Sequence, residues 1–231
     1  AGSVCGSGMA EREFSTLGHE RANNPRLQFE SRDAFIDFKV EENHYQPPYF
    51  RRMEQLNLTG GPPLPRPLTP PPLTAQAFEE AGALPVDVRG IAAFLGAHLP
   101  GILALPADMV PAFAGWLLDP GDDLVLVADD GGQAAAAAHH LARIGYDRVT
   151  GYLNPALTGW AASGRPFAGL VAVDTDMVAQ RLDERDNAWT LLDVRGLPEV
   201  ESARIPEAKH IYVGELPDRL SELDPERRYT T

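Results

Sequence analysis

The alternation of apolar runs and helical stretches between residues 84 and 152 predicts an α/β unit. Apolar runs typical of strands occupy residues 84–88, 102–105, 124–128 and 148–152. The run at 124–128 is continuous, as expected of a strand that is buried on both faces. Helices are expected around Phe94 and over the alanine-rich residues 134–144. Strands separated by helices of this length predict a parallel sheet that is flanked by helices on both faces.

A proline-rich segment precedes this unit. Seven of the eleven residues from 62 to 72 are prolines. Each proline lacks a backbone N–H donor and fixes φ, so neither a helix nor a central strand is expected here. We predict an extended linker of polyproline character over residues 61–73. A docking motif for a proline-reading domain is the alternative interpretation.

Residues 1–60 have the pattern of a domain's tail. Ser31 is placed to cap a helix that carries Phe35, and the Pro47-Pro48 pair is placed to open a second helix that ends at Gly60. Two short helices with polar connections bury too little apolar surface to fold alone. We therefore expect the body that they pack on to precede them, which would make this chain a fragment.

The charge and the cysteine content narrow the function classes. The net charge is −13 and the pI is near 4.8, which disfavours binding to nucleic acids or anionic membranes. The single cysteine, Cys5, excludes an internal disulfide and fits a reducing compartment, so a cytoplasmic location is expected. Neither a membrane-spanning apolar run nor a signal peptide is recognisable in the sequence.

An internal repeat divides the rest of the chain. Asp87-Val88-Arg89 recurs 106 residues later as Asp193-Val194-Arg195, and Leu99-Pro100 recurs at the same spacing as Ile205-Pro206. We interpret residues 74–170 and 174–231 as two copies of one α/β unit. The second copy would be truncated, because its counterpart of the 124–128 strand lies where the sequence given ends.

The repeated unit resembles a rhodanese domain. The resemblance rests on the Asp-Val-Arg strand ends, on His98-Leu99-Pro100-Gly101, and on the strand, glycine-containing loop and helix from Leu124 to Ala138. Rhodaneses transfer a sulfane sulfur through a cysteine at the tip of that loop. A cradle of backbone N–H groups and the helix N-terminus stabilise the thiolate.

The resemblance implies that the cysteine position is filled by an alanine. The aligned loop, which we interpret as vestigial, consists of Ala128, Asp129, Asp130, Gly131, Gly132 and Gln133. Two carboxylates also oppose an anion at this point. The alternative interpretation makes Asp129 and Asp130 a general base or a pair of metal ligands. The second copy would carry its cysteine near position 234, and Arg204 replaces the turn histidine there.

Residues 1–60 resemble the end of a metallo-β-lactamase-fold domain, of the branch fused to rhodanese repeats and related to persulfide dioxygenases and glyoxalase II enzymes. The matching stretches are Ala1-Gly2-Ser3-Val4-Cys5-Gly6, Ser15-Thr16-Leu17-Gly18-His19-Glu20-Arg21, Asn24-Pro25 and Pro47-Pro48-Tyr49-Phe50.

The resemblance implies that iron or zinc is bound in the parent metal domain, with its histidine ligands upstream of Ala1. The six histidines here lack metal-ligand spacing, so we expect no metal or cofactor site in this chain. Cys5 is interpreted as a packed residue, or alternatively as a reactive thiol.

The resemblance implies a parent that is a metal-dependent hydrolase or a persulfide dioxygenase acting on thiol persulfides or thioesters, such as glutathione derivatives. The expected partners are that small substrate, the missing N-terminal metal domain and a second copy in a homodimer. No catalytic residue is expected in this chain itself. The alternatives are a non-catalytic docking or dimerisation module, and an independent hydrolase that uses Asp129 and Asp130.

Overall fold

The computed structural model describes residues 14–41, 47–61, 63, 68–184 and 189–231. The chain divides into two compact units, Ala1–Gln46 and Pro47–Thr231. The interpretations of Cys5, of the Ala1–Gly6 stretch and of residues 62 and 64–67 in the proline-rich segment concern residues outside the described ranges.

The first unit contains α1 (Leu17–Asn23), the short 3-10 helix η1 (Pro25–Leu27) and α2 (Arg32–Glu41). The predicted cap of α2 is confirmed, because the Ala34 N–H donates to Ser31 Oγ at 3.1 Å. The ring of Phe29 packs against the rings of Phe35 and Phe38, with centroids 5.5 and 5.0 Å apart. Neither helix contains a buried residue, as expected of helices that bury little apolar surface by themselves.

The second unit opens with α3 (Tyr49–Thr59), which follows the Pro47-Pro48 pair and ends at Gly60 in the left-handed region, with φ at 84°. Tyr49 is buried in the core formed with the parallel sheet, and its hydroxyl donates to the Pro111 carbonyl at 3.4 Å. The expectation that no partner body follows this helix is therefore wrong. The ring of Tyr49 fits into this core because Gly115 has no side chain. A Cβ at position 115 would lie 1.8 Å from Tyr49 Cδ1.

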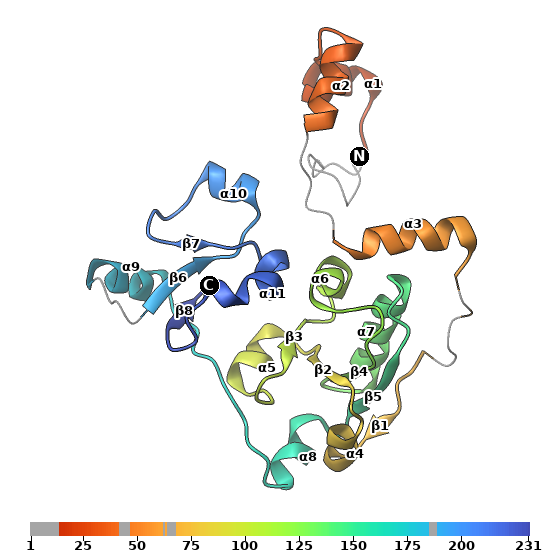
Figure 1. The fold of residues 1–231 in the computed structure, drawn as a ribbon, viewed down its shortest axis with the longest axis vertical. Coiled ribbons are helices and arrows are strands. Elements are labelled where there is room, and N and C mark those ends of the chain that lie inside the picture. Colours follow the sequence, from red (N-terminus) through yellow and green to blue (C-terminus); the bar gives the residue numbers. More distant parts are fainter. Residues whose placement is uncertain (1–13, 42–46, 62, 64–67, 185–188) are drawn as a thin grey trace. The chain divides into compact units, whose positions relative to one another are not determined.

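The main sheet has five strands in the order β1-β5-β4-β2-β3, and every neighbouring pair is parallel (Figure 1). The strands are β1 (Pro72–Leu73), β2 (Leu84–Asp87), β3 (Leu103–Ala104), β4 (Leu124–Val127) and β5 (Val149–Leu153). The predicted parallel sheet is confirmed, and the continuous apolar run forms its central strand.

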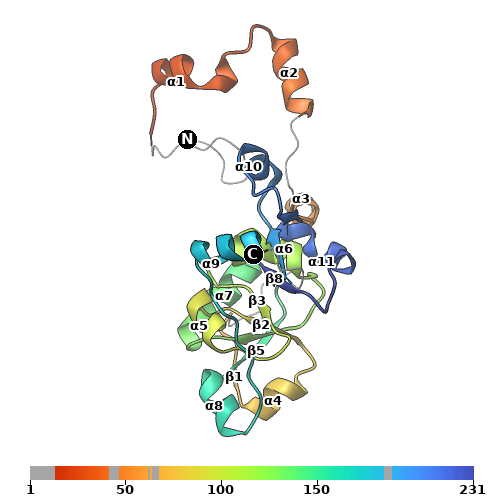
Figure 2. The ribbon, with the colours of Figure 1, turned by 90° about the vertical axis from the view of Figure 1, so that its left-hand side faces the viewer.

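Helices cover both faces of this sheet, as Figures 1 and 2 show from two directions. One face carries α6 (Val110–Leu117) and α7 (Gly131–Arg143); the other carries α4 (Ala75–Glu80), α5 (Ile91–Gly96) and α8 (Ala156–Ala162). The side chains of β4 alternate between the two cores. Leu124 and Leu126 belong to the first, and Val125 and Val127 to the second. Burial on both faces explains why this strand has no polar position.

The last two residues of the predicted linker belong to the sheet. Pro72 and Leu73 lie opposite Tyr152 and Leu153, and the Asn154 N–H donates to the Leu73 carbonyl at 2.9 Å. A proline is tolerated at this place because β1 is an edge strand, whose outer side needs no donor. The interpretation of residues 72–73 as linker is corrected accordingly.

Residues 175–231 form a second, three-stranded parallel sheet in the order β7-β6-β8. The elements are α9 (Thr175–Glu184), β6 (Trp189–Asp193), α10 (Leu197–Ser202), β7 (Lys209–His210), η2 (Val213–Glu215), α11 (Leu216–Arg219), η3 (Leu220–Glu222) and β8 (Arg228–Thr230). Helix α10 and strand β7 follow α5 and β3 by 106 residues. The third strand of this sheet, β8, corresponds to β4 in the first sheet, with a spacing of 105 residues. Leu191 of β6 pairs with Thr230 of β8, as Pro85 of β2 pairs with Val125 of β4.

Candidate functional site

The predicted vestigial loop joins the central strand β4 to the N-terminus of α7. Ala128 ends the strand side of the loop and is fully buried, whereas Asp129 and Asp130 are exposed. Asp130 is the N-cap of α7: its Oδ1 accepts a hydrogen bond from the Gln133 N–H at 2.8 Å. Gln133 Oε1 in turn accepts one from the Asp129 N–H at 2.8 Å. The two side chains thus bind the loop backbone reciprocally.

These bonds decide what the loop can do. The N-terminus of a helix attracts an anion through its unpaired N–H groups. Here the carboxylate of Asp130 already bonds to one of those donors, and its negative charge opposes an incoming anion. No thiol is present, because Ala128 occupies the expected cysteine position. The structure brings the six predicted loop residues together, but it gives them the geometry of a helix cap.

The alternative of a metal pair gains no support from the geometry. Among the described residues, no three His, Cys, Asp or Glu side chains converge as metal ligands. His98 and His210 have other contacts. His98 is buried and stacks on Phe94 with ring centroids 4.0 Å apart, and His210 Nε2 lies 2.8 Å from the Arg195 carbonyl oxygen.

A buried ion pair lies beside the loop, at the end of β2. Arg89 Nη2 donates to Asp87 Oδ2 at 2.7 Å and to the Ala97 carbonyl at 2.7 Å, and Arg89 Nε donates to Asp87 Oδ1 at 2.9 Å. The side chains are 6% and 0% exposed. The Arg89 side chain joins the strand end to the residue that follows α5. This pair therefore supports the fold and leaves no charge available for a ligand.

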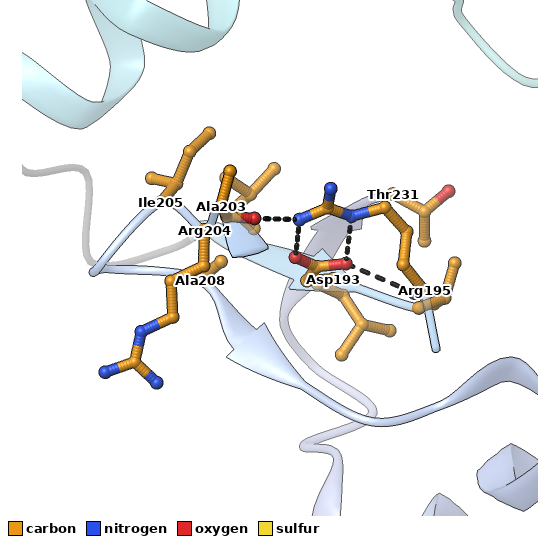
Figure 3. A pocket seen from close by; sticks show the side chains of 10 residues that line it. Asp193, Arg195, Ala203, Arg204, Ile205, Ala208 and Thr231 are labelled. Carbon is orange, nitrogen blue, oxygen red and sulfur yellow. Dashed lines mark hydrogen bonds and ion pairs between the residues drawn. The ribbon is translucent and has the colours of Figure 1, made fainter. Parts of the chain in front are cut away.

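The same geometry recurs at the end of β6. Arg195 Nη2 donates to Asp193 Oδ2 at 2.7 Å and to the Ala203 carbonyl at 2.8 Å, as Figure 3 shows. Here the side chains of Arg195 and Asp193 are 43% and 11% exposed. The hydrogen bonds from Arg195 lower the pKa of the Asp193 carboxyl to about 2.

A cavity of about 490 Å³, which we did not predict from the sequence, adjoins this second pair. Most of its surface is apolar, and Ile205 and Ala208 are among the residues that line it (Figure 3). Ile205 is 42% exposed, whereas its counterpart Leu99 is 4% exposed and packs in the core with Trp160. One signal in the sequence points to the cavity: Ala208 stands where the first unit has the larger Ile102.

The comparisons with known proteins agree with this fold. Residues 71–163 match the model of the rhodanese-like domain family. A metallo-beta-lactamase structure from Staphylococcus aureus subsp. aureus COL is 29% identical, with a TM-score of 0.51, over 60% of this chain and 40% of that one. The chain thus spans about two fifths of the length of that protein.

Two further structures are more distant. A rhodanese-like domain from Anabaena sp. is 24% identical, with a TM-score of 0.36, over 41% of this chain and 99% of that one. A thiosulfate sulfurtransferase from Pseudomonas aeruginosa is 19% identical, with a TM-score of 0.37, over 70% of this chain and 38% of that one. No curated protein matches.

Of the helices in the described ranges, none is both long and apolar enough to span a membrane. The parallel sheet with helices on both faces and the family match cover the same stretch of the chain. Residues 71–163 are therefore a rhodanese-like domain.

Proposed function

We propose that this chain is part of a fusion between a metallo-β-lactamase-fold enzyme and tandem rhodanese-like modules. The parent acts on thiol persulfides or thioesters, such as glutathione derivatives. Residues 71–163 are its first rhodanese-like module and serve as a scaffold without sulfur transfer of their own. Residues 174–231 belong to the second module, and residues 1–46 to the end of the metal domain. Iron or zinc would be held by side chains of the parent's metal domain, in a reducing, cytoplasmic compartment.

The observation that carries this proposal is the loop at the end of β4. The strand, loop and helix are those of a sulfurtransferase site, yet Ala128 stands at the cysteine position and the Asp130 carboxylate caps α7. A rhodanese reaction needs a thiolate to accept the sulfur atom. The module therefore retains the fold and has lost the nucleophile.

The likeness to the Staphylococcus aureus metallo-beta-lactamase supports the fusion. It extends over more of the chain than the rhodanese-like domain alone, because it covers 60% of the 231 residues. The repeated strand–helix–strand order in residues 189–210, together with the identical Asp–Arg geometry, supports a second module.

The test is a sulfur-transfer assay with thiosulfate and cyanide. We expect the purified chain to form no thiocyanate above a protein-free control, with an active rhodanese as the positive control. The matched variant is Cys5→Ala, because Cys5 is the only thiol. Thiocyanate formation that survives this substitution would show a sulfur acceptor other than cysteine and would overturn the proposal.

A second candidate function is a non-catalytic docking or dimerisation module. The observation that favours it is again the β4 loop, where Ala128 stands at the cysteine position and the Asp130 carboxylate caps α7, so that the module has the fold without a sulfur acceptor. Sedimentation equilibrium of the chain across a concentration series tests it. A dimer that forms as the concentration rises would favour docking; a monomer throughout the series would rule out dimerisation of this chain.

A further inference from the structure

A second cavity, far from the β4 loop in sequence, lies between α3 and the end of α6. Its volume is about 300 Å³, at the lower end of the range for small-molecule sites. The lining residues that the argument uses are Tyr49, Arg52, Trp116, Asp119 and Tyr146. None of them belongs to the rhodanese loop, and the proposed function gives them no role.

The arginine in this cavity has a donor with no partner. Within the described part of the chain, Arg52 Nε is buried and forms no hydrogen bond. A buried donor of a charged group is costly unless an acceptor reaches it. Arginine binds carboxylates through Nε and a terminal nitrogen together, in a planar pair of hydrogen bonds. Because Arg52 also lines the cavity, its guanidinium group is suited to a carboxylate that enters there.

The opposite charge in the lining is Asp119. Its Oδ1 accepts a hydrogen bond from the Gly121 N–H at 2.7 Å, and a carboxylate has about four acceptor positions, so capacity for a further donor remains. Tyr146 does not supply a charge. Burial raises the pKa of its phenol to about 12, and its hydroxyl donates to the Leu118 carbonyl at 3.0 Å. The cavity therefore presents one cation and one anion.

The rest of the lining is suited to an apolar group. Tyr49 is buried, and Trp116, Leu117 and Leu118 continue the same surface. Aromatic rings contribute a large apolar area in a small site. A ligand that satisfies all three features carries a carboxylate, an ammonium group and a short apolar or thioether side chain.

We propose that this cavity binds a small zwitterionic amino acid, with its carboxylate on Arg52, its ammonium group on Asp119 and its side chain against Tyr49 and Trp116. The site is independent of the proposed function, because it uses no residue of the β4 loop. The result of the sulfur-transfer assay therefore neither supports nor contradicts this proposal.

The test is isothermal titration calorimetry of the whole chain with three probes. L-Methionine carries both charges, N-acetyl-L-methionine lacks the ammonium group, and L-methioninamide lacks the carboxylate. We expect L-methionine to bind and each of the other two to bind about tenfold more weakly or worse, because each loses one charged hydrogen-bonding pair. Equal affinity for all three probes, or no binding of L-methionine at millimolar concentration, would overturn the proposal.

Protein variants then assign the two charges. Arg52→Gln should abolish L-methionine binding, while Arg51→Gln on the exposed side of the same helix should leave it unchanged. Asp119→Asn should weaken binding, with the exposed Asp108→Asn as its control. If Arg52→Gln leaves the affinity intact, the carboxylate site is refuted. Should Arg52→Gln unfold, the three probes on the unchanged chain still decide the outcome.

Discussion

Two regions of this protein, the strand ends at Asp87–Arg89 and at Asp193–Arg195, have the same hydrogen bonds in different surroundings. In both, Arg Nε lies 2.9 Å from Asp Oδ1 and Arg Nη2 lies 2.7 Å from Asp Oδ2. The first pair is buried, whereas 43% of the Arg195 side chain is exposed. The local sequence thus determines the geometry of the pair, and the elements packed around it determine its contribution to stability.

The largest expected effect is the removal of the buried arginine. Arg89→Ala should destabilise the rhodanese-like domain by about 3–5 kcal/mol, because it leaves the Asp87 carboxylate buried without a partner. Arg195→Ala should cost about 1 kcal/mol or less, because the Arg195 side chain is 43% exposed and water can enter the space that it leaves beside Asp193. Urea unfolding followed by tryptophan fluorescence measures both; Trp160 lies in α8 beside the five-stranded sheet, and Trp189 lies in β6 of the three-stranded sheet. Equal losses for the two variants would refute the role of burial.

The next effect concerns α3, which packs on the core of the five-stranded sheet. Gly115→Ala should cost about 1–3 kcal/mol, because the new Cβ would overlap the buried ring of Tyr49. The control is Gly96→Ala on α5, where an added Cβ meets no atom within 4 Å. Thermal unfolding compares the two variants. A Gly115→Ala protein as stable as the control would mean that α3 is not seated on this body.

A smaller effect is expected from pH on the exposed pair. The pKa of Asp193 is lowered to about 2 in the folded state, so its contribution to stability is complete above the ordinary pKa of 3.8. That contribution is lost as the pH falls from 3.8 towards 2. The unfolding free energy of Asp193→Asn should therefore lie below that of the unchanged protein at pH 6, and the gap should narrow by pH 2.5. A gap independent of pH would contradict the assignment.

The smallest expected effect is that of Ala128→Cys on sulfur transfer. Asp129 and Asp130 flank the new thiol, and like charges within about 4–6 Å disfavour the thiolate. They also repel thiosulfate. We therefore expect no efficient turnover from the single substitution and more from Ala128→Cys combined with Asp129→Ser and Asp130→Ser. Serine at position 130 keeps an N-cap for α7. A single variant whose thiol titrates below about 8.5 and turns over rapidly would show that the loop is still an anion cradle.

The sequence was sufficient for much of the fold and for part of the site. The continuous run at 124–128 predicted the central parallel strand, and the prolines at 47–48 with Gly60 predicted α3, because these patterns depend on local backbone preferences. The absence of a cysteine at Ala128 is equally a property of the sequence. The capping role of Asp130 could also have been recognised, because an aspartate precedes the helix and Gln133 follows three residues later.

Only the tertiary structure decided where the helices pack and which polar groups are buried. The sequence of α3 shows an apolar face but not what that face packs against. In the structure the ring of Tyr49 packs against Gly115 of α6, which has no side chain in its way. The partner of Pro72 lies 80 residues away in β5, so its strand is invisible to a local pattern. The cavity lined by Arg52 and Asp119 likewise joins residues distant in sequence. Local preferences fix the elements, whereas long-range packing fixes burial, and burial sets the strength of each polar interaction.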